Sequence, residues 1–298
     1  MLRYTEQLNS GLMRIASLIS GILFFISLCQ HLHALPNDSL TLDDLENQSG
    51  VHFKLAALGG HSEYCIGIVL TNNTDDSIGV FIEPGRVLLA ENADFQDLVV
   101  MRSLYFKVPR RTEVKKSIYA FCCRAKRASP AKDLVFRNGF IDLGLLGMLG
   151  DFVDKGRFSP TDIQSSVWAI SDNYPIASVC DNSGSISTLK KWLADQLKKP
   201  YPWHCIEYDR ADTAVQQTRH LRVFGNFSFH VPHYSTINIQ VRTREGHIVD
   251  YIQKDAVYSA GKIDYPVDFS VQNWPKGIYE ILVFADGNRI NKPTFFDL

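Results

Sequence analysis

The feature that most constrains the fold is a two-residue alternation of apolar and polar side chains, which recurs in two separate stretches of the chain. In residues 51–124 it runs through YCIGIVLT, SIGVFIEP and EVKKSIYAFCC, with turn signals such as Pro84-Gly85 between the runs. In residues 225–298 it runs through FSFHV, INIQVRT and YEILVFA. Alternation places successive side chains on opposite faces of a strand. This spacing predicts a β-sandwich domain at residues 35–130 and an immunoglobulin-like β-sandwich at residues 225–298.

The stretch between them, residues 131–208, changes to a helical period. Apolar residues recur at this spacing on three faces, which hold Leu143, Leu146, Leu149 and Val153; Ile163, Val167 and Ile170; and Leu189, Trp192, Leu193 and Leu197. The third helix, residues 187–199, has a lysine-rich outer face and ends before Pro200. We expect a small helical unit packed on the first sandwich, then a polar linker at residues 209–224. The predicted fold class is therefore mainly β with a helical insertion.

The N-terminal segment predicts export. Arg14 precedes the apolar stretch Ile15–Leu28, which is too short to cross a bilayer core of ~30 Å as a helix, and Ala34 suits cleavage. We interpret residues 1–34 as a signal peptide. The mature chain then has no stable membrane span and is secreted or held at the outer cell surface. The alternatives are a membrane anchor formed by the same stretch and a lipoprotein modified at Cys29.

Charge and motifs argue against several function classes. The chain has 31 Lys and Arg against 32 Asp and Glu, a balance that does not suit a nucleic-acid partner. It holds no phosphate-binding loop, dinucleotide fingerprint or nucleophile elbow, so we expect no cofactor and no catalysis. His230 and His233 lack nearby ligand residues, so we interpret them as part of a turn and expect no metal. A hydrolase with an unrecognised site remains an alternative, with His61, His204 or His220 as its base.

The C-terminal stretch also carries a recognisable succession of residues. WPKGIY at residues 274–279 leads into a strand, the turn Asp286-Gly287 follows, and Lys292 closes the pattern. This succession resembles the C-terminal sorting domains of the bacterial type IX secretion system, which share their sandwich with the hook-capping immunoglobulin-like module. The resemblance implies a bacterial host, passage of the outer membrane and export machinery as a partner. The alternative is an accessory sandwich in which Tyr279 fills the core.

Five cysteines follow the predicted leader, and an odd number cannot all pair within one chain. In an exported protein we expect at least one disulfide among them. Cys180 and Cys205 are the favoured pair because they flank the third predicted helix. Closing that loop would stabilise the helical unit by roughly 3 kcal/mol. Cys65 is a further disulfide candidate.

Two segments stand out for their chemistry: Cys122-Cys123 at the end of a predicted strand, and Gln164, four residues before Trp168, in a predicted helix. They resemble the Cys and Gln motifs of thioester domains in bacterial surface adhesins. The resemblance implies an internal thioester between Gln164 and Cys122 or Cys123, which would acylate an amine on a host surface. The simpler alternative makes Trp168 a core aromatic and the cysteines disulfide partners. Adjacent strand residues point to opposite faces, so only one of the two cysteines can face the helix.

These observations favour a secreted or cell-surface protein that acts by binding or as a structural component, without catalysis. Its C-terminal sandwich would serve export or attachment, and its ligand would be a surface protein or a glycan. The first alternative is a covalent adhesin that uses Gln164 and Cys122 or Cys123. The second is the secreted hydrolase described above.

Overall fold

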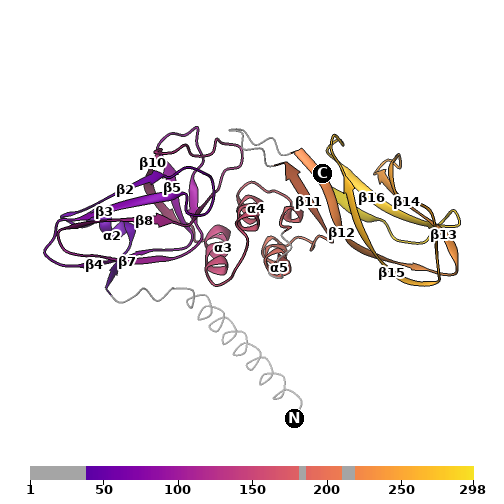
Figure 1. Cartoon of the computed structure of the whole chain (residues 1–298), viewed down its shortest axis with the longest axis horizontal. Helices are drawn as coiled ribbons and strands as arrows, with labels where there is room; N and C mark the ends of the chain where they lie inside the picture. Colours follow the sequence, from indigo (N-terminus) through magenta and orange to yellow (C-terminus); the bar gives the residue numbers. More distant parts are fainter. Residues whose placement is uncertain (1–37, 181–185, 210–218) are drawn as a thin grey trace, which may run out of the picture. The chain divides into compact units, whose positions relative to one another are not determined.

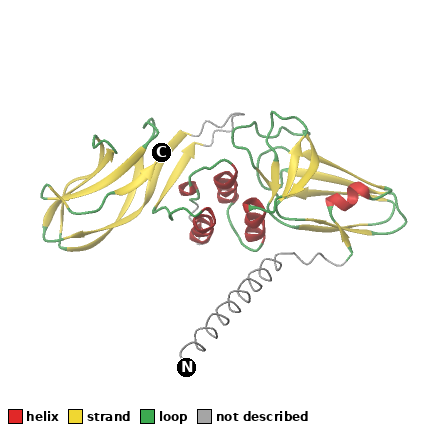
Figure 2. Ribbon diagram, turned by 180° about the vertical axis from the view of Figure 1, so that it is seen from behind, coloured by secondary structure: helices red, strands yellow, loops and turns green. Residues whose placement is uncertain are grey.

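The computed structural model describes residues 38–180, 186–209 and 219–298 (Figures 1 and 2). Strands dominate these residues, and a small group of helices lies between residues 145 and 197. The predicted fold class, mainly β with a small helical unit and sandwich-like antiparallel sheets, is confirmed. The predicted signal peptide, residues 1–34, lies outside the described residues, as do residues 210–218 of the predicted linker. Within the three described ranges, no helix is both long and apolar enough to span a membrane.

The first β region contains one short helix and two sheets. Its elements are β1 (Ser39–Leu40), α2 (Leu42–Asn47), β2 (Val51–Ala57), β3 (Ile66–Asn72), β4 (Ile78–Ile82), β5 (Arg86–Ala90), β6 (Leu98–Val100), β7 (Leu104–Val108), β8 (Thr112–Ile118), β9 (Ala120–Cys122) and β10 (Val135–Ile141). The larger sheet has the order β8-β3-β2-β10-β5-β6-β9, and β4 pairs with β7 in the smaller one. The predicted alternation is clear in β3, where Ile66, Ile68 and Leu70 are buried and the residues between them are half-buried.

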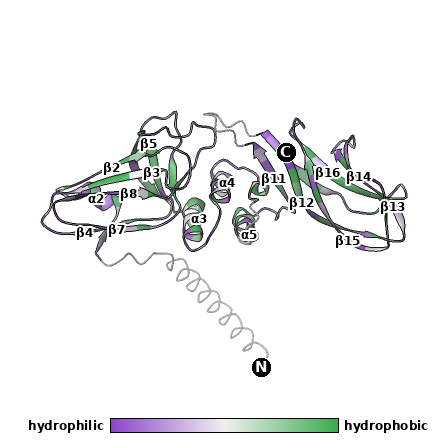
Figure 3. Cartoon of the chain, viewed as in Figure 1, coloured by the Kyte–Doolittle hydropathy of each residue, from purple (hydrophilic) through white to green (hydrophobic). Residues whose placement is uncertain are grey.

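The larger sheet buries side chains on both faces. On one face Ile68 and Leu70 pack with Val80 and Phe106 of the smaller sheet, and we call this group the sandwich core. On the other face Val99 and its neighbours pack against the helices, and we call this group the helix-facing core. Figure 3 shows hydrophobic colour along β3, β5 and α3. Burial of each large apolar side chain contributes ~1.5–3 kcal/mol, so these two cores supply the main stabilisation of the region.

Arg86 of β5 ties α2 to the larger sheet. Its side chain is fully buried, and its guanidinium donates to the Asp43 carboxylate at 2.7 and 2.9 Å. It also donates to Glu83 at 2.8 and 3.3 Å and to Asn138 Oδ1 at 3.1 Å. The hydrogen bonds from Arg86 hold the pKa of Asp43 below its ordinary value. One buried cation therefore joins a helix and two strands that lie far apart in the sequence.

The helical unit consists of α3 (Leu145–Asp154), α4 (Pro160–Ser171), the 3-10 helix η2 (Ile176–Ser178) and α5 (Ile186–Leu197). Ser159 caps α4, because its Oγ accepts from the backbone N–H of Asp162 at 3.1 Å, and Pro160 occupies the first helical position. The prediction of a helix at residues 187–199 is confirmed to within two residues at its C-terminal end. The placement of Leu143 on the first helical face was wrong. It precedes α3 and is 91% exposed, since the helix begins only after Gly144.

Glycines in α3 allow its backbone to approach the turn before β5. A Cβ on Gly147 would lie 1.8 Å from the carbonyl oxygen of Asp142, and one on Gly150 would lie 2.7 Å from the backbone nitrogen of Gly85. Gly85 itself has a φ of 81°, a conformation that favours glycine. The glycines lower the helix propensity of α3. The close approach of the α3 backbone to Asp142 and Gly85 nevertheless requires glycine at these positions.

The C-terminal β region also has two sheets. Its elements are β11 (His204–Asp209), β12 (Arg219–Val231), β13 (Ser235–Thr243), β14 (Ile248–Tyr258), β15 (Gly261–Ser270), β16 (Ile278–Ala285), β17 (Asn288–Arg289) and β18 (Thr294–Asp297). One sheet has the order β11-β12-β15 and the other β14-β13-β16-β17, with β18 also paired to β16. Apolar residues from both sheets share one core, which includes Val223, Phe229, Val231, Ile237, Ile239, Val241, Ile281, Val283 and Phe296.

The strands of this region extend past the limits that the sequence suggested. β11 pairs along its length with β12, from His204↔Gly225 to Asp209↔Arg219. Residues 204–208, expected in the helical unit, and residues 209 and 219–224, expected in the linker, therefore lie in strands. Ion pairs across the sheet accompany this pairing. The exposed side chain of Arg222 forms ion pairs across the sheet with Glu207 and, at 2.9 Å, with Asp268.

Candidate functional site

The structure places Gln164 against the backbone of Cys122. α4 packs on β9, and Gln164 is only 2% exposed. Its Nε2 donates to the carbonyl oxygen of Cys122 at 2.7 Å, and its Oε1 accepts from the backbone N–H of Cys122 at 3.2 Å. Both polar ends of the Gln164 amide are therefore satisfied by a single residue of the neighbouring strand.

The thiols near Gln164 are buried and face different cores. Cys122 belongs to the sandwich core and Cys123 to the helix-facing core, so they point to opposite faces as the strand period predicts. Cys123 Sγ donates to the Asp97 carbonyl at 3.2 Å, and Cys65 Sγ donates to the Ala120 carbonyl at 3.3 Å. Burial raises the pKa of Cys65 and of Cys123 to about 12, and that of Cys122 well above its ordinary value. The thioester, which needs a thiolate at the amide carbon of Gln164, stays a prediction.

Replacing Gln164 by leucine is expected to lower the free energy of unfolding by about 2 kcal/mol, because two buried hydrogen bonds at ~1 kcal/mol each are lost. Urea unfolding of the variant measures this change. Gln272→Leu, at an exposed position, is the matched control and should stay close to the wild type. An intact wild-type mass that is lower by one ammonia would contradict this structural role, since it would show Gln164 condensed with a thiol.

A second pair of thiols lies where η2 meets β11. Cys180 follows η2 and Cys205 belongs to β11, and the Cys180 thiol donates to the Ala177 carbonyl at 2.7 Å. Cys180 Sγ also lies 3.9 Å from the Ile206 carbonyl, and Cys205 Sγ lies 3.8 Å from the Val179 carbonyl. Both cysteines are partly exposed, and like the other three in the described residues they are free thiols. Each sulfur thus lies beside the residue next to the other cysteine, so the two that the sequence favoured as partners are close together, and their disulfide remains a prediction.

Lys190 lies beside this pair, although the lysines of α5 were expected on its outer face. It is 4% exposed, and its Nζ donates to the His204 carbonyl at 2.7 Å and to Cys205 Sγ at 3.3 Å. The neighbouring Cys180 thiol and the charge of Lys190 lower the pKa of Cys205 to about 7, whereas burial raises the pKa of Cys180. One sequence feature indicated the buried position of Lys190, since this residue follows the inward-facing Leu189.

The histidines proposed as hydrolytic bases have other surroundings. His204 is buried between the rings of Trp203 and Phe296, and neither ring nitrogen has a hydrogen-bond partner among the described residues. Burial lowers the pKa of His204 to about 4 and also lowers the pKa of His220. His61 contributes its backbone carbonyl, which accepts from Cys122 N at 3.1 Å. These contacts give His204 and His61 structural surroundings, and the hydrolase alternative stays a prediction.

His233 lies in the predicted turn, between β12 and β13, whereas His230 lies in β12. Ser235 Oγ is 2.8 Å from His233 Nδ1, and Asp286 Oδ2 is 3.9 Å from the same nitrogen. A catalytic triad uses the two ring nitrogens for the two partners, so this arrangement is a turn contact. In the part of the chain that the structure covers, no three His, Cys, Asp or Glu side chains gather as metal ligands would.

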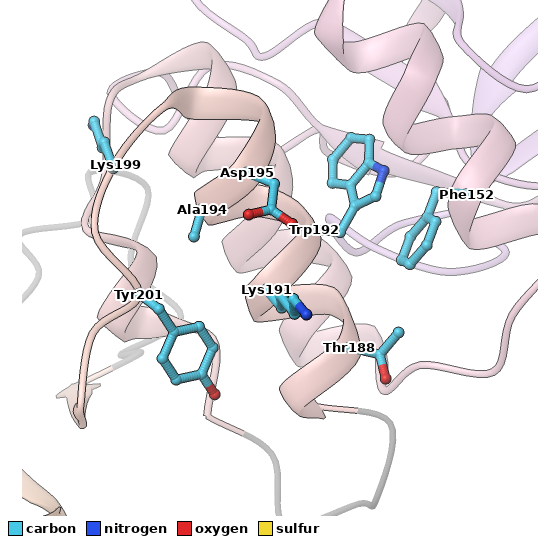
Figure 4. Close-up of a pocket in the computed structure, with 8 residues that line it drawn as sticks. All are labelled: Phe152, Thr188, Lys191, Trp192, Ala194, Asp195, Lys199 and Tyr201. Carbon is cyan, nitrogen blue, oxygen red and sulfur yellow. The ribbon is translucent and has the colours of Figure 1, made fainter.

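A cleft of about 690 Å³ lies along α5 (Figure 4). Trp192 stacks on Phe152 of α3 at a ring-centroid distance of 5.1 Å, and together they form an aromatic wall. The other lining residues are polar or small, apart from one further aromatic: Thr188, Lys191, Ala194, Asp195, Lys199 and Tyr201. The volume falls within the ~300–1,000 Å³ of small-ligand pockets. No local sequence pattern indicated this cleft, because α3 and α5 are brought together only by folding.

No protein-family model matches this chain, and a comparison with curated proteins found no match. The geometry alone thus identifies the candidate sites, which are the Gln164 contact, the Cys180–Cys205 pair with Lys190, and the cleft along α5. Of these, the cleft has the size and the mixture of groups that suit reversible binding of a small ligand.

Proposed function

We propose that this protein is exported, acts by binding a glycan without catalysis, and uses its C-terminal sandwich for export or attachment. The observation that carries the proposal is the cleft along α5. Aromatic and charged side chains share its walls, which suits a ligand with both apolar faces and hydroxyl groups. A sugar ring is such a ligand, since its C–H face packs on aromatic rings and its hydroxyls hydrogen-bond to polar groups.

The chemistry of individual lining residues supports a glycan. Tyr201 is 49% exposed, so its ring is available for stacking. Asp195 offers acceptors for sugar hydroxyls, and Lys191 and Thr188 offer donors one and two turns away on the same helix. A cleft with donors and acceptors on one rigid helix holds them at fixed spacing, which favours selection among sugars.

The role of the C-terminal region rests on its residues and their packing. Tyr279 of the WPKGIY segment is buried, stacks on Phe296 and donates from its hydroxyl to the Pro275 carbonyl at 2.6 Å. The ring of Trp274 packs on the ring of Tyr279 at a centroid distance of 5.2 Å. The motif that resembles a sorting domain thus forms part of the core of this region. The same packing would also suit an accessory sandwich. Passage through a type IX system is therefore proposed from the resemblance of the motif.

Replacing Tyr201 by alanine is expected to weaken glycan binding about tenfold, which corresponds to ~1.4 kcal/mol. The reason is the loss of an exposed ring at the edge of the cleft. The measurement is retention of the chain, without its predicted leader, on a panel of immobilised polysaccharides, followed by titration of the best oligosaccharide. Asp195→Ala should weaken binding through loss of a hydrogen-bond acceptor.

Tyr64→Ala is the matched control, because Tyr64 is 60% exposed and lies outside the cleft. The affinity of Tyr64→Ala for the oligosaccharide should equal that of the wild type. Equal losses in Tyr201→Ala and Tyr64→Ala would place binding elsewhere. A chain that retains no polysaccharide would contradict the glycan proposal and leave a surface protein as the ligand to test.

A further inference from the structure

The side chains of Cys180, Cys205 and Lys190 form a nucleophilic group that the proposed glycan binding does not use, and we call it the dithiol site. Three parts of the chain build it: the second residue after η2, strand β11 and helix α5. Both cysteines are partly exposed, so a solute can reach them, whereas Lys190 is buried beneath them. The other three described cysteines are fully buried and carry raised pKa values. Exposure therefore separates this pair from the rest.

The position of Lys190 needs a negative partner. Burial of an ammonium is unfavourable unless nearby groups compensate its charge. Its Nζ lies 2.7 Å from the His204 carbonyl oxygen and 3.3 Å from Cys205 Sγ. A thiolate at Cys205 would supply the compensating charge at this distance. The site is therefore built to favour ionisation of one particular thiol.

Other titratable groups around the site act more weakly or stay neutral. Asp162 of α4 accepts from the backbone N–H of Cys180 at 2.9 Å, and its charge opposes ionisation of Cys205. His204 of β11 stays neutral, because burial lowers its pKa to about 4. Burial raises the pKa of Tyr208, also in β11, so it stays protonated. Among these neighbours, Lys190 is the cation that favours the Cys205 thiolate.

We propose that Cys180 and Cys205 are a redox-active dithiol that exchanges with disulfides, with Cys205 as the attacking thiolate, Lys190 as its stabilising cation and Cys180 as the resolving thiol. The oxidant is a disulfide, either a small molecule such as oxidised glutathione or a disulfide of another protein. The reaction needs no metal or cofactor as a partner.

Exchange takes place in two balanced steps. The Cys205 thiolate attacks one sulfur of the disulfide, which forms a mixed disulfide and releases the first thiolate. Cys180 then loses its proton to solvent and attacks Cys205 Sγ, which releases the second thiolate and forms the Cys180–Cys205 bond. Two protein thiols are oxidised, one disulfide is reduced to two thiols, and the two protons go to the released thiolates. In the reverse reaction, Lys190 stabilises Cys205 as the leaving group, so the bond is readily reduced.

The cross-link would join the end of η2 to β11 and close a loop that contains α5. α5 carries most of the residues that line the cleft. Oxidation would therefore restrict the helix that forms this cleft. The dithiol chemistry itself does not depend on what the cleft binds, so failure of the glycan test leaves this inference standing.

The test treats the reduced full chain with oxidised glutathione and maps the products by mass spectrometry. The wild type should lose two hydrogens at Cys180 and Cys205 and retain no glutathione. Cys180→Ser should hold one glutathione on Cys205, since the resolving thiol is absent. Cys205→Ser should leave Cys180 unmodified over the same time.

Alkylation with iodoacetamide gives the expected size of the effect. A thiol with a pKa near 7 offers about 50-fold more thiolate at pH 7 than one with a pKa of 9. The lower nucleophilicity of that thiolate reduces its reaction rate by about eightfold. Cys205 should therefore react roughly sixfold faster than an ordinary exposed thiol. Lys190→Met should remove most of this advantage and move the midpoint of the pH profile upward. Lys190→Arg should keep it.

Lys198→Met is the matched control, because Lys198 is an exposed lysine just after α5, and its rates should equal those of the wild type. The proposal is overturned if Cys205 follows the pH profile of an ordinary thiol, or if a folded Lys190→Met variant reacts as fast as the wild type. Should Lys190→Met fail to fold by circular dichroism, the pH profile of the wild type alone decides the question.

Discussion

Replacing Arg86 by methionine is expected to lower the free energy of unfolding by about 3–5 kcal/mol, the cost of breaking a buried ion pair by removing one partner. The guanidinium is fully buried and bonds to Asp43, Glu83 and Asn138 at once. Methionine fills a similar volume but donates no hydrogen bond. Glu83, whose side chain is 13% exposed, would then keep its charge without a partner.

Urea unfolding measures this loss, and Arg111→Met provides the matched control. Arg111 forms an ion pair with Asp75 at 2.8 Å, but both side chains are well exposed. Exposed pairs contribute about 0–1 kcal/mol, so the control should change little. Equal losses in the two variants would contradict the stabilising role assigned to the buried cluster.

The same cluster predicts a dependence on pH. Hydrogen bonds from Arg86 lower the pKa of Asp43 below its ordinary 3.8, so the unfolded chain binds a proton more readily than the folded one. The contribution of Asp43 is therefore complete above pH 3.8 and is lost as the pH falls below that value. In Arg86→Met this acid-sensitive part of the stability should be absent.

Replacing Gly147 by alanine is expected to destabilise the protein by about 3 kcal/mol, at the upper end of the range for overpacking. Helix propensity predicts the opposite sign, since alanine is favoured over glycine in a helix by ~1 kcal/mol. The steric clash outweighs the helix propensity, because the new Cβ would lie 1.8 Å from the Asp142 carbonyl oxygen. A backbone atom cannot turn away as a flexible side chain can, so α3 would have to shift.

Thermal and urea unfolding of Gly147→Ala test this expectation. Met148→Ala is the control at the next position of α3, where the side chain is 39% exposed and the backbone is unchanged. It should cost much less than Gly147→Ala. A Gly147→Ala variant that is more stable than the wild type would show that α3 does not approach Asp142 as closely as described.

Local patterns predicted the elements of the fold well. Alternation in β3 and β13 and helical spacing in α5 each reflect one buried face, and that information lies within a few neighbouring residues. β11 and the start of β12 were missed because the polar stretch between Asp209 and His220 indicated a linker, whereas Glu207 and Arg222 on either side of it pair across the two strands. Polar composition alone does not distinguish an exposed strand face from a loop.

The candidate sites were harder to predict, because they depend on distant contacts. The sequence favoured Cys180 and Cys205 as partners from their positions around one helix. It placed Lys190 with the exposed lysines, although the residue lies at the edge of the apolar face that contains Leu189 and Leu193. The cleft along α5 depends on Phe152, which is far away in the sequence. Spacing within one segment carries no information on such a neighbour.

The central position of β10 has a consequence for how the first β region folds. β10 pairs with β2 on one side and with β5 on the other, so it joins β8-β3-β2 to β5-β6-β9. Until it arrives, β2 and β5 each present an open edge, and such edges pair readily with other chains. Pairing of strands so far apart in sequence is slow. The arrival of β10 therefore sets a kinetic competition between completion of the sheet and aggregation, and dilute conditions favour completion.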